Sequence, residues 1–306
     1  MITTVCLNPA FDKTVTVVEL RPGEVNRILD VREDMGGKGI NVAAVAHRLG
    51  LDVQCIGLMG EKGAESLRDK MAGEGFAFDF MTVPGSIRTN LKVVSRNGQA
   101  VTELNEPGAP VGPEVMDAFL QKLHKKEKGD LAVVTGSLPP GCPEETYREM
   151  IRIIGPVPCI LDAEGSKLLL GLEAKPLLVK PNVLELETTL GITLHSNQEI
   201  RDAALFLIKR GARSVIVSMG KMGAMFVDGE RALYAPALDV PVHSTVGAGD
   251  AMVGGVLLGL TKGGSLVEAF RYGMAAGAAS VMTEGTQPLR LDDFQALLPK
   301  VRMQEV

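Results

Sequence analysis

Strong charge of either sign is missing from this sequence of 306 residues, which carries a formal net charge of −5. The 32 basic residues set against 37 acidic ones leave no basic footprint, which argues against nucleic acid as a partner. An anionic ligand would therefore need a few local cations and backbone donors. Hydrophobic residues make up 45% of the chain and charged residues 23%, which is ordinary for a folded protein with a substantial core.

Cysteine, histidine and long apolar runs are also scarce. The four cysteines and four histidines are scattered and form no CxxC pair, which favours buried, reduced thiols over a metal site. The start of the chain lacks the basic segment of a signal peptide. The most apolar stretches, Ala251–Leu260 and Gly273–Met282, are too short to span a bilayer. We therefore expect a cytoplasmic protein with no membrane partner.

Three familiar motifs are absent. Gly-Lys occurs at Gly37–Lys38 and at Gly220–Lys221, but without the Ser or Thr that follows in a Walker A loop. No GxGxxG opens the first βα unit, which disfavours a nicotinamide-dependent dehydrogenase. The GxSxG of α/β-hydrolases is missing too. Any phosphate transfer must use another construction.

Short apolar runs alternate with helical patterns through most of the chain. The apolar runs predict buried strands at Thr3–Leu7, Leu131–Thr135, Cys159–Asp162, Leu177–Val179 and Ser214–Ser218. Between them, the spacing predicts helices at Gly39–Leu49, Gly63–Glu74, Pro113–Glu127, Pro143–Ile154 and Gln198–Arg210. Pro113 and Pro143 each suit the first turn of a helix. This alternation predicts an α/β fold with helices on both faces of one mostly parallel sheet.

Two parts of the chain depart from this pattern. Polar and apolar residues alternate in two pairs of segments, Thr14–Leu20 with Asn26–Arg32 and Asn90–Ser95 with Ala100–Asn105. Asn-Gly within the second pair is a strong hairpin signal. We expect residues 12–34 and 88–105 to form a small antiparallel sheet, inserted into one domain that spans 1–306. Because a half-exposed sheet needs a partner, it should cover a site, a second subunit or both.

The most informative element is the glycine-rich stretch Ser244–Gly255, which apolar residues at helical spacing follow. Gly247 and Gly249 permit a tight turn that exposes N–H groups at a helix start, and this arrangement binds anions. Asp250 lies in the same first turn. Taken alone, its carboxylate could equally be a capping group or a functional one.

Two further glycine motifs occur at Met35–Ala46 and Ser218–Ala224. In the first, Lys38 and Asn41 stand at the mouth of an apolar helix, which favours a ligand contact over a flexible connection. The second follows a strand directly, and by itself it is better explained as a hairpin turn.

These glycine motifs occur in a fixed order with other short motifs: Asn8–Asp12, Gly36–Asn41, Arg88–Lys92, Gly136–Pro140, Lys180–Glu185, Ser218–Gly223 and Gly247–Asp250. The set resembles the ribokinase-like sugar kinases, in the phosphofructokinase B branch, along nearly the whole chain. Lys38 is more similar to 1-phosphofructokinases and tagatose-6-phosphate kinases than to 6-phosphofructokinases, and Thr102–Gly108 favours the first of these. The resemblance implies a Rossmann-like three-layer α/β/α core with a β-sheet lid, ATP and Mg²⁺, and a homodimer through the lid.

The resemblance also implies roles for individual residues. Asp250 would be the general base, and the amides of Gly247, Ala248 and Gly249 would stabilise the transferring phosphoryl group. Sugar-phosphate binding would fall to Asp12, Arg27, Gly37, Lys38, Asn41, Arg88 and Ser137. Arg27 would reach a phosphate from the predicted lid, either within its own chain or across a dimer interface. ATP binding would fall to Lys180, Asn182, Ser218, Gly220, Gly223, Thr245, Gly247 and Gly249. Glu185 would order Mg²⁺ and its waters, although it could also be a helix-surface charge.

We therefore expect the C6 hydroxyl of fructose 1-phosphate to be phosphorylated by Mg·ATP, giving fructose 1,6-bisphosphate. Tagatose 6-phosphate and fructose 6-phosphate remain alternative substrates, since they differ only in phosphate position or in one stereocentre. A non-catalytic sensor of sugar phosphate or nucleotide is the alternative of another class. Asp162–Gly165 departs from the family, which often has a hydroxyl residue before an acidic one there, and we expect it to lie away from the chemistry.

Overall fold

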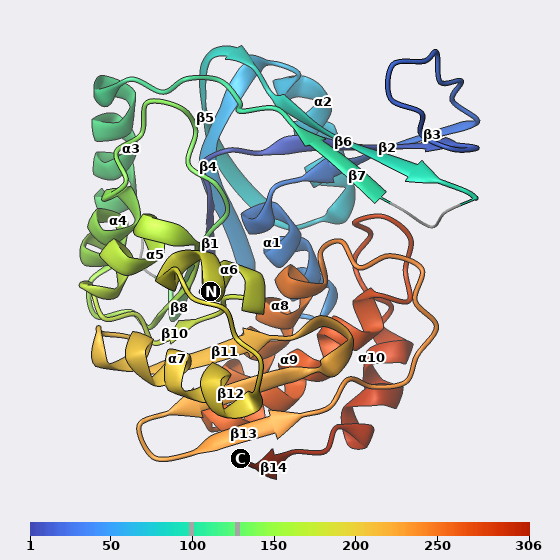
Figure 1. The fold of residues 1–306 in the computed structure, drawn as a ribbon. Helices are drawn as coiled ribbons and strands as arrows, with labels where there is room; N and C mark the ends of the chain where they lie inside the picture. Colours follow the sequence, from blue (N-terminus) through green and yellow to red (C-terminus); the bar gives the residue numbers. More distant parts are fainter. Residues whose placement is uncertain (98–100, 126–128) are drawn as a thin grey trace.

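The computed structural model describes residues 1–97, 101–125 and 129–306. Its strands form a large sheet within the core and a small sheet that projects from it (Figure 1). Gly98 of the predicted hairpin turn and the predicted helix end at Glu127 lie outside the described residues. None of the described helices is long and apolar enough to cross a membrane.

The large sheet carries the five predicted strands, each within one residue of its expected bounds. Neighbouring strands are parallel from β5 (Ala77–Ser86) to β11 (Ser214–Ser218) and antiparallel from β11 to β14 (Gln304–Glu305). The order is β14 (Gln304–Glu305), β13 (Ala232–Ala235), β12 (Ala224–Asp228), β11 (Ser214–Ser218), β10 (Leu178–Val179), β9 (Cys159–Asp162), β8 (Leu131–Thr135), β1 (Ile2–Cys6), β4 (Val53–Lys62) and β5 (Ala77–Ser86). The prediction did not include the strands β4 and β5, nor the strands β12, β13 and β14 that form the antiparallel edge.

Helices cover both faces of this sheet, so the predicted three-layer core is confirmed (Figure 1). One hydrophobic cluster contains side chains from α1 (Lys38–Arg48), α2 (Ala64–Glu74), α8 (Ala248–Thr261), α9 (Leu266–Ser280) and α10 (Leu291–Leu297). The other contains side chains from α3 (Pro113–Lys125), α4 (Thr146–Ile154), α5 (Gly165–Leu172), α6 (Val183–Leu190) and α7 (Asn197–Lys209). Two short 3₁₀ helices are η1 (Gly220–Met222) and η2 (Leu298–Lys300).

Helix starts follow local capping chemistry. Pro113 begins α3 as predicted, whereas Pro143 precedes α4, and the Thr146 hydroxyl donates a 2.6 Å hydrogen bond to its carbonyl oxygen. α6 begins with a capping box, in which Asn182 Oδ1 accepts from the Glu185 N–H and Glu185 Oε2 accepts from the Asn182 N–H, both at 2.8 Å. The start of α8 has no side-chain cap. Its exposed amides are therefore left for another acceptor.

The helix α8 is apolar nearly all round and is buried between α1 and α9. Close backbone approach makes this packing possible, because a Cβ on Gly255 would lie 2.5 Å from the Tyr272 carbonyl oxygen. On the other side, a Cβ on Gly254 would lie 2.5 Å from a methyl group of Val45. The helix α8 is thus fixed with respect to α1 and α9.

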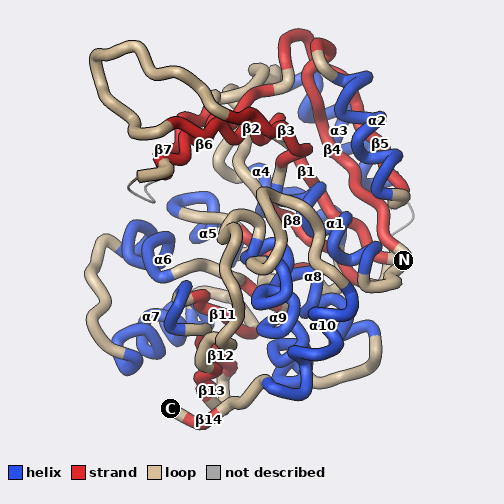
Figure 2. The backbone as a smooth tube through the Cα atoms, turned by 90° about the vertical axis from the view of Figure 1, so that its right-hand side faces the viewer, coloured by secondary structure: helices blue, strands red, loops and turns tan. Residues whose placement is uncertain are grey.

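The small sheet has the order β3 (Asp30–Gly36), β2 (Ala10–Val17), β6 (Arg88–Ser95) and β7 (Val101–Asn105). It lies at one end of the core (Figure 2). β2 and β3 are antiparallel, as are β6 and β7, but β2 and β6 are parallel. The prediction of a purely antiparallel sheet is therefore wrong, and the sheet is mixed. β2 continues outward from β1, and β6 continues outward from β5. Because β1 and β5 are parallel core strands that end at the same edge of the large sheet, β2 and β6 leave the core in the same direction.

Two strands of the small sheet, β2 and β3, also lie closer to the core along the chain than predicted. β2 and β3 occupy Ala10–Val17 and Asp30–Gly36, where the alternation predicted Thr14–Leu20 and Asn26–Arg32. The residues between them form an exposed loop, seen in dark blue in Figure 1. Alternation reports which face of a strand is buried, and it fixes the ends of a strand only loosely.

Candidate active site

A cavity of about 1630 Å³ lies between the small sheet and the core. Residues at or just after the carboxyl ends of β8, β9, β10 and β11 line its core side, where parallel α/β sheets commonly bind ligands. The strands β2, β6 and β7 supply the opposite wall. The cavity brings together the following residues predicted from the sequence: Asp12, Gly37, Lys38, Asn41, Arg88, Ser137, Lys180, Asn182, Glu185, Ser218, Gly220, Gly223, Thr245, Gly247, Ala248, Gly249 and Asp250.

Arg27 is the exception among the predicted residues. Its side chain is exposed on the loop between β2 and β3, and it does not line the cavity. The expected phosphate contact of Arg27 therefore does not arise within a single chain.

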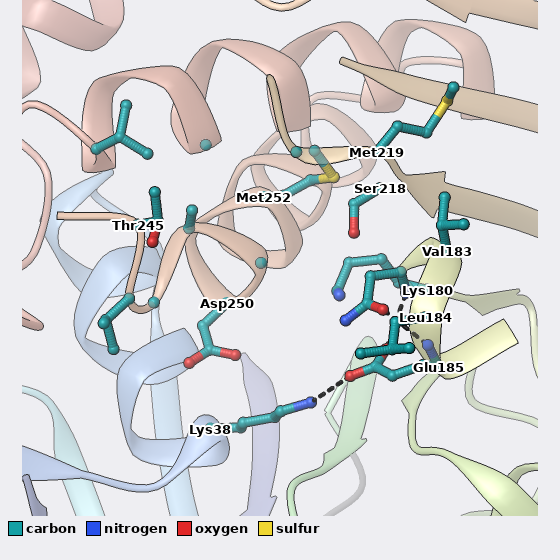
Figure 3. A pocket seen from close by; sticks show the side chains of 18 of the residues that line it. Lys38, Lys180, Val183, Leu184, Glu185, Ser218, Met219, Thr245, Asp250 and Met252 are labelled. Carbon is teal, nitrogen blue, oxygen red and sulfur yellow. Dashed lines mark hydrogen bonds and ion pairs between the residues drawn. The ribbon is translucent and has the colours of Figure 1, made fainter. Parts of the chain in front are cut away.

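Asp250 lies in the first turn of α8, after Gly247, whose φ of 78° is left-handed. The carboxylate is only 6% exposed, and its Oδ2 accepts a 2.8 Å hydrogen bond from Asn41 Nδ2. Burial raises the pKa of Asp250 to about 6, although the nearby Lys38 charge opposes this rise. At neutral pH the carboxylate is thus ionised and close to the pKa that suits a general base. The side chain points toward Lys38 in Figure 3.

Asp162 connects the two lysines of the site, which corrects the expectation that it lies away from the chemistry. This 1% exposed carboxylate ends β9, and its two oxygens lie 3.3 Å from Lys38 Nζ and 3.3 Å from Lys180 Nζ. Thr135 Oγ1 donates a further 2.9 Å hydrogen bond to Oδ2. Burial alone would raise the pKa of Asp162, but Lys180 and Lys38 outweigh it and lower the pKa to about 2.

Lys38 is the most exposed member of this group, with 40% of its side chain accessible. Its Nζ also lies 3.7 Å from Glu185 Oε1, the contact drawn in Figure 3. The Asp162 carboxylate raises the pKa of Lys38, with smaller contributions from Asp250 and Glu185, against the effect of desolvation. Lys38 is therefore a permanent cation between three carboxylates.

Glu185 lines the cavity and is also the third residue of the α6 capping box. One of its carboxylate oxygens is used by the cap and the other faces Lys38. Among the described residues, no group of three or more histidine, cysteine, aspartate or glutamate side chains is arranged to hold a metal ion. A Mg²⁺ ion at Glu185 would thus be bound mainly by phosphate oxygens and water, which is common for Mg²⁺ in phosphoryl-transfer sites.

The glycine motif after β11 lines the far end of the cavity. Ser218 ends β11, Gly220 begins η1, and Gly223 precedes the antiparallel strand β12, so the predicted hairpin connection is confirmed. Gly223 has a φ of 105°, and a Cβ there would lie 2.0 Å from the Ala235 carbonyl oxygen. The surrounding side chains are mostly apolar, which suits a flat aromatic ring: Met219, Val240, Val242, Val246, Met252, Met274 and Val281.

Two cavity features escaped the sequence reasoning, and each had a signal. Asp162 is the last residue of a predicted strand, at the sheet edge where the other site residues gather. Lys92 lies in the motif Arg88–Lys92 and shares the parity of Arg88 along the strand, which places both on one face.

The family of the chain follows from sequence comparison. The model of the pfkB family of carbohydrate kinases matches residues 6–292. The chain belongs to this family. Membership in this kinase family implies that ATP is the phosphoryl donor, in agreement with the cavity described above.

Individual relatives of this PfkB-family kinase agree with the family assignment. The 1-phosphofructokinase of Rhodobacter capsulatus is 40% identical over 90% of this chain and 88% of its own length. The 1-phosphofructokinase of Escherichia coli K12 is 34% identical over 99% of this chain and 98% of its own. The crystal structure of phosphofructokinase-2 from Escherichia coli in complex with potassium has a TM-score of 0.90 and 31% identity, covering 98% of each chain. The predicted fold class is thereby confirmed.

Proposed function

We propose that this kinase transfers the γ-phosphoryl group of ATP to the C6 hydroxyl of fructose 1-phosphate, as a 1-phosphofructokinase. The observation that carries the proposal is the placement of Asp250, a buried carboxylate at an uncapped helix start, beside cationic Lys38 in one cavity. Relatives of this chain that are 34% and 40% identical are named 1-phosphofructokinase.

The proposed reaction begins at Asp250. Its carboxylate accepts the proton of the C6 hydroxyl as the hydroxyl oxygen attacks the γ-phosphorus. The bond from the γ-phosphorus to the β–γ bridging oxygen breaks, and ADP leaves with that oxygen. Asn41 fixes the direction of the Asp250 carboxylate through its 2.8 Å hydrogen bond. Such a reaction depends on positioning and charge neutralisation more than on covalent catalysis.

Backbone amides and Lys180 supply that neutralisation. The first-turn N–H groups of α8 point to the place where an anion would bind, since no side chain caps them. Lys180 Nζ lies 3.1 Å from the position that a Cβ of Gly249 would take, so the ammonium group packs against the same turn. A larger residue at Gly249 would push this cation aside.

At the sugar end, the proposal assigns hydroxyl contacts to Asp12 and Asn41 and phosphate contacts to Arg88, Lys38 and Ser137. Asn41 Oδ1 is buried and has no hydrogen-bond partner among the described residues, so it can accept from a sugar hydroxyl. Arg88 donates to the Asn8 carbonyl oxygen at 3.2 Å and to the Glu106 carbonyl oxygen at 3.4 Å. Neutral carbonyls leave its charge free for a phosphate.

Magnesium belongs to the same proposal. When bound, Mg²⁺ would neutralise charge on the ATP phosphates. Glu185 would hold it through the oxygen that now faces Lys38. The other nucleotide contacts are assigned to Asn182, Ser218, Gly220, Gly223 and Thr245, which line the cavity around the apolar end.

Substrate identity is tested by measuring ADP release from the purified protein with fructose 1-phosphate, tagatose 6-phosphate and fructose 6-phosphate. We expect the highest kcat/KM with fructose 1-phosphate, and no turnover when EDTA removes the divalent cation. A higher kcat/KM with either other sugar would replace the proposed substrate. Binding of sugar phosphate and ATP with no ADP release in the presence of Mg²⁺ would instead identify a sensor.

Residues 12–34 and 88–105 are proposed as the lid of a single kinase domain that spans 1–306. The small sheet of this lid is the proposed dimer surface. Apolar side chains are exposed in one chain on the sheet, at Val31, Val101 and Leu104, and on the loop between β2 and β3, at Val18, Val25, Ile28 and Leu29. Large exposed apolar patches commonly mark interfaces. We expect light scattering at assay concentration to give twice the 32.5 kDa chain mass. A monomeric mass would contradict this proposal.

A cytoplasmic location is part of the proposal as well. The four cysteines are free thiols, and burial raises the pKa of Cys6 and Cys142 to about 11 and of Cys159 to about 12. Such thiols are little ionised at neutral pH and react slowly. Free, unreactive thiols suit a reducing compartment.

A further inference from the structure

Lys92 is a buried lysine on the cavity side of the small sheet, with no role in the chemistry described above. Alternate residues of a strand point to the same side, so β6 presents Arg88, Asn90 and Lys92 on one face. All three line the cavity. Lys92 is 7% exposed, and a lysine is rarely buried this deeply without a charged partner.

The partner of Lys92 is Asp12 on the neighbouring strand β2. Lys92 Nζ lies 3.4 Å from Asp12 Oδ2, and Asp12 is 6% exposed. The other carboxylate oxygen, Oδ1, accepts a 2.9 Å hydrogen bond from Asn90 Nδ2. Each oxygen of Asp12 is thus held by one side chain of β6.

Gly36 of β3 closes another side of the Asp12 carboxylate. A Cβ on Gly36 would lie 2.6 Å from Cγ and 2.6 Å from Oδ1 of Asp12, so the carboxylate packs directly on the glycine backbone. Turning away would break the contacts to Lys92 and Asn90. The carboxylate held in this way lines the cavity.

Stability of the sheet does not explain this arrangement. The apolar cluster of the sheet, centred on Val15, Val17 and Val93, occupies positions of the opposite strand parity and therefore the other face. A buried ion pair adds little net stability, because the desolvation of two charges offsets their attraction. The cost of burying the Lys92–Asp12 pair is better explained by a function on the cavity side of the sheet.

We propose that Lys92 is a positioning residue, which holds the Asp12 carboxylate in place and aims it at the hydroxyl groups of the bound sugar phosphate. The inference rests on the proposed function, in which Asp12 binds those hydroxyls. Lys92 then acts on sugar recognition through Asp12, without touching ATP.

Steady-state kinetics of Lys92→Met tests this role. We expect KM for the sugar phosphate to rise about 10–100-fold, the scale of one charge-assisted hydrogen bond. Both kcat and KM for ATP should stay within about 3-fold of wild type. Lys92→Arg retains the cation and should recover most of the affinity. A changed KM for ATP with an unchanged KM for sugar would overturn the proposal.

A double-mutant cycle with Asp12→Asn separates an indirect role from direct contact. If Lys92 acts through Asp12, the double variant should match Asp12→Asn alone within about 3-fold in KM for sugar, because the partner is already lost. Multiplying effects would show that Lys92 contacts substrate itself and would overturn a positioning role. A lowered melting temperature of Lys92→Met with a normal KM for sugar would also overturn the positioning role.

Lys13→Met is the matched control. Lys13 lies next to Asp12 on the same strand but has the opposite parity, so it faces away from the cavity. Its KM for sugar should equal that of wild type. The cycle uses whichever sugar phosphate the wild type prefers, so a different preferred substrate would change the proposed function without deciding the role of Lys92.

Discussion

Replacing Asp250 by Asn is expected to lower kcat by roughly 10²–10⁴-fold, the range for loss of a general base. Asparagine keeps the size of the side chain and can still hydrogen-bond to Asn41, so the geometry should survive. It cannot accept the proton of the C6 hydroxyl. Steady-state kinetics and isothermal titration with ATP measure the two consequences: kcat should collapse while the Kd for ATP stays within about 3-fold.

Protein stability should not fall with this change. Burial raises the folded-state pKa of Asp250 above the value of an unfolded aspartate, so ionisation of this carboxyl disfavours folding once the pH exceeds that unfolded value. At pH 7 a neutral amide removes that penalty. The melting temperature of Asp250→Asn should therefore equal or exceed that of wild type, which would separate lost chemistry from lost folding.

Asp293→Asn is the matched control, because Asp293 is also an acidic residue in the first turn of a helix. It lies outside the cavity and pairs at 3.7 Å with Arg290. If both carboxylates only interact with helix dipoles, the two variants should behave alike. Equal turnover of Asp250→Asn and Asp293→Asn would remove Asp250 from the mechanism and leave it only an interaction with the helix dipole.

The core of this fold could be predicted because its strands are continuous apolar runs. β8, β9 and β11 have the bounds that the sequence indicated, since parallel strands buried on both faces leave a strong signal. β4 and β5 were harder, because glycines and charged residues interrupt them. The direction of β6 against β2 depends on where each chain segment leaves the core, which no local pattern encodes.

The candidate site was predictable where glycines and polar residues adjoin in the sequence. Gly247–Asp250 and Gly36–Asn41 each place several site residues in one turn, and the cavity contains both. The strand positions of Asp162 and Lys92 were a signal in the sequence, but their importance became clear only in three dimensions, because their partners lie far along the chain. Arg27 lies on the loop beside the predicted lid strand and outside the cavity of its own chain, because sequence spacing cannot tell a lid strand from the loop beside it. Its expected phosphate contact across a dimer interface stays a prediction.

The second large effect is expected for Lys38→Met, which removes the cation shared by three carboxylates. Lys38 Nζ lies 3.3 Å from Asp162, and its charge lowers the pKa of Asp250 from the value that burial alone would produce. The proposed function gives Lys38 a contact to the substrate phosphate, and the loss of one charge-assisted hydrogen bond costs about 10–100-fold in kcat/KM. We expect kcat/KM of Lys38→Met to fall by about that factor. The kcat/KM of Lys38→Arg should lie between those of Lys38→Met and wild type.

The pH profile distinguishes this electrostatic role from simple loss of packing. Asp250 must be ionised to accept a proton, so kcat/KM of the wild type should decline as the pH falls through about 6. Without the Lys38 charge, the pKa of Asp250 rises, and the acid limb should move to higher pH. The limb of Lys70→Met should stay in place, because Lys70 pairs with Glu33 outside the cavity. A Lys38→Met limb that stays fixed or moves to lower pH would show that Lys38 does not set the proton affinity of the base, even if turnover falls.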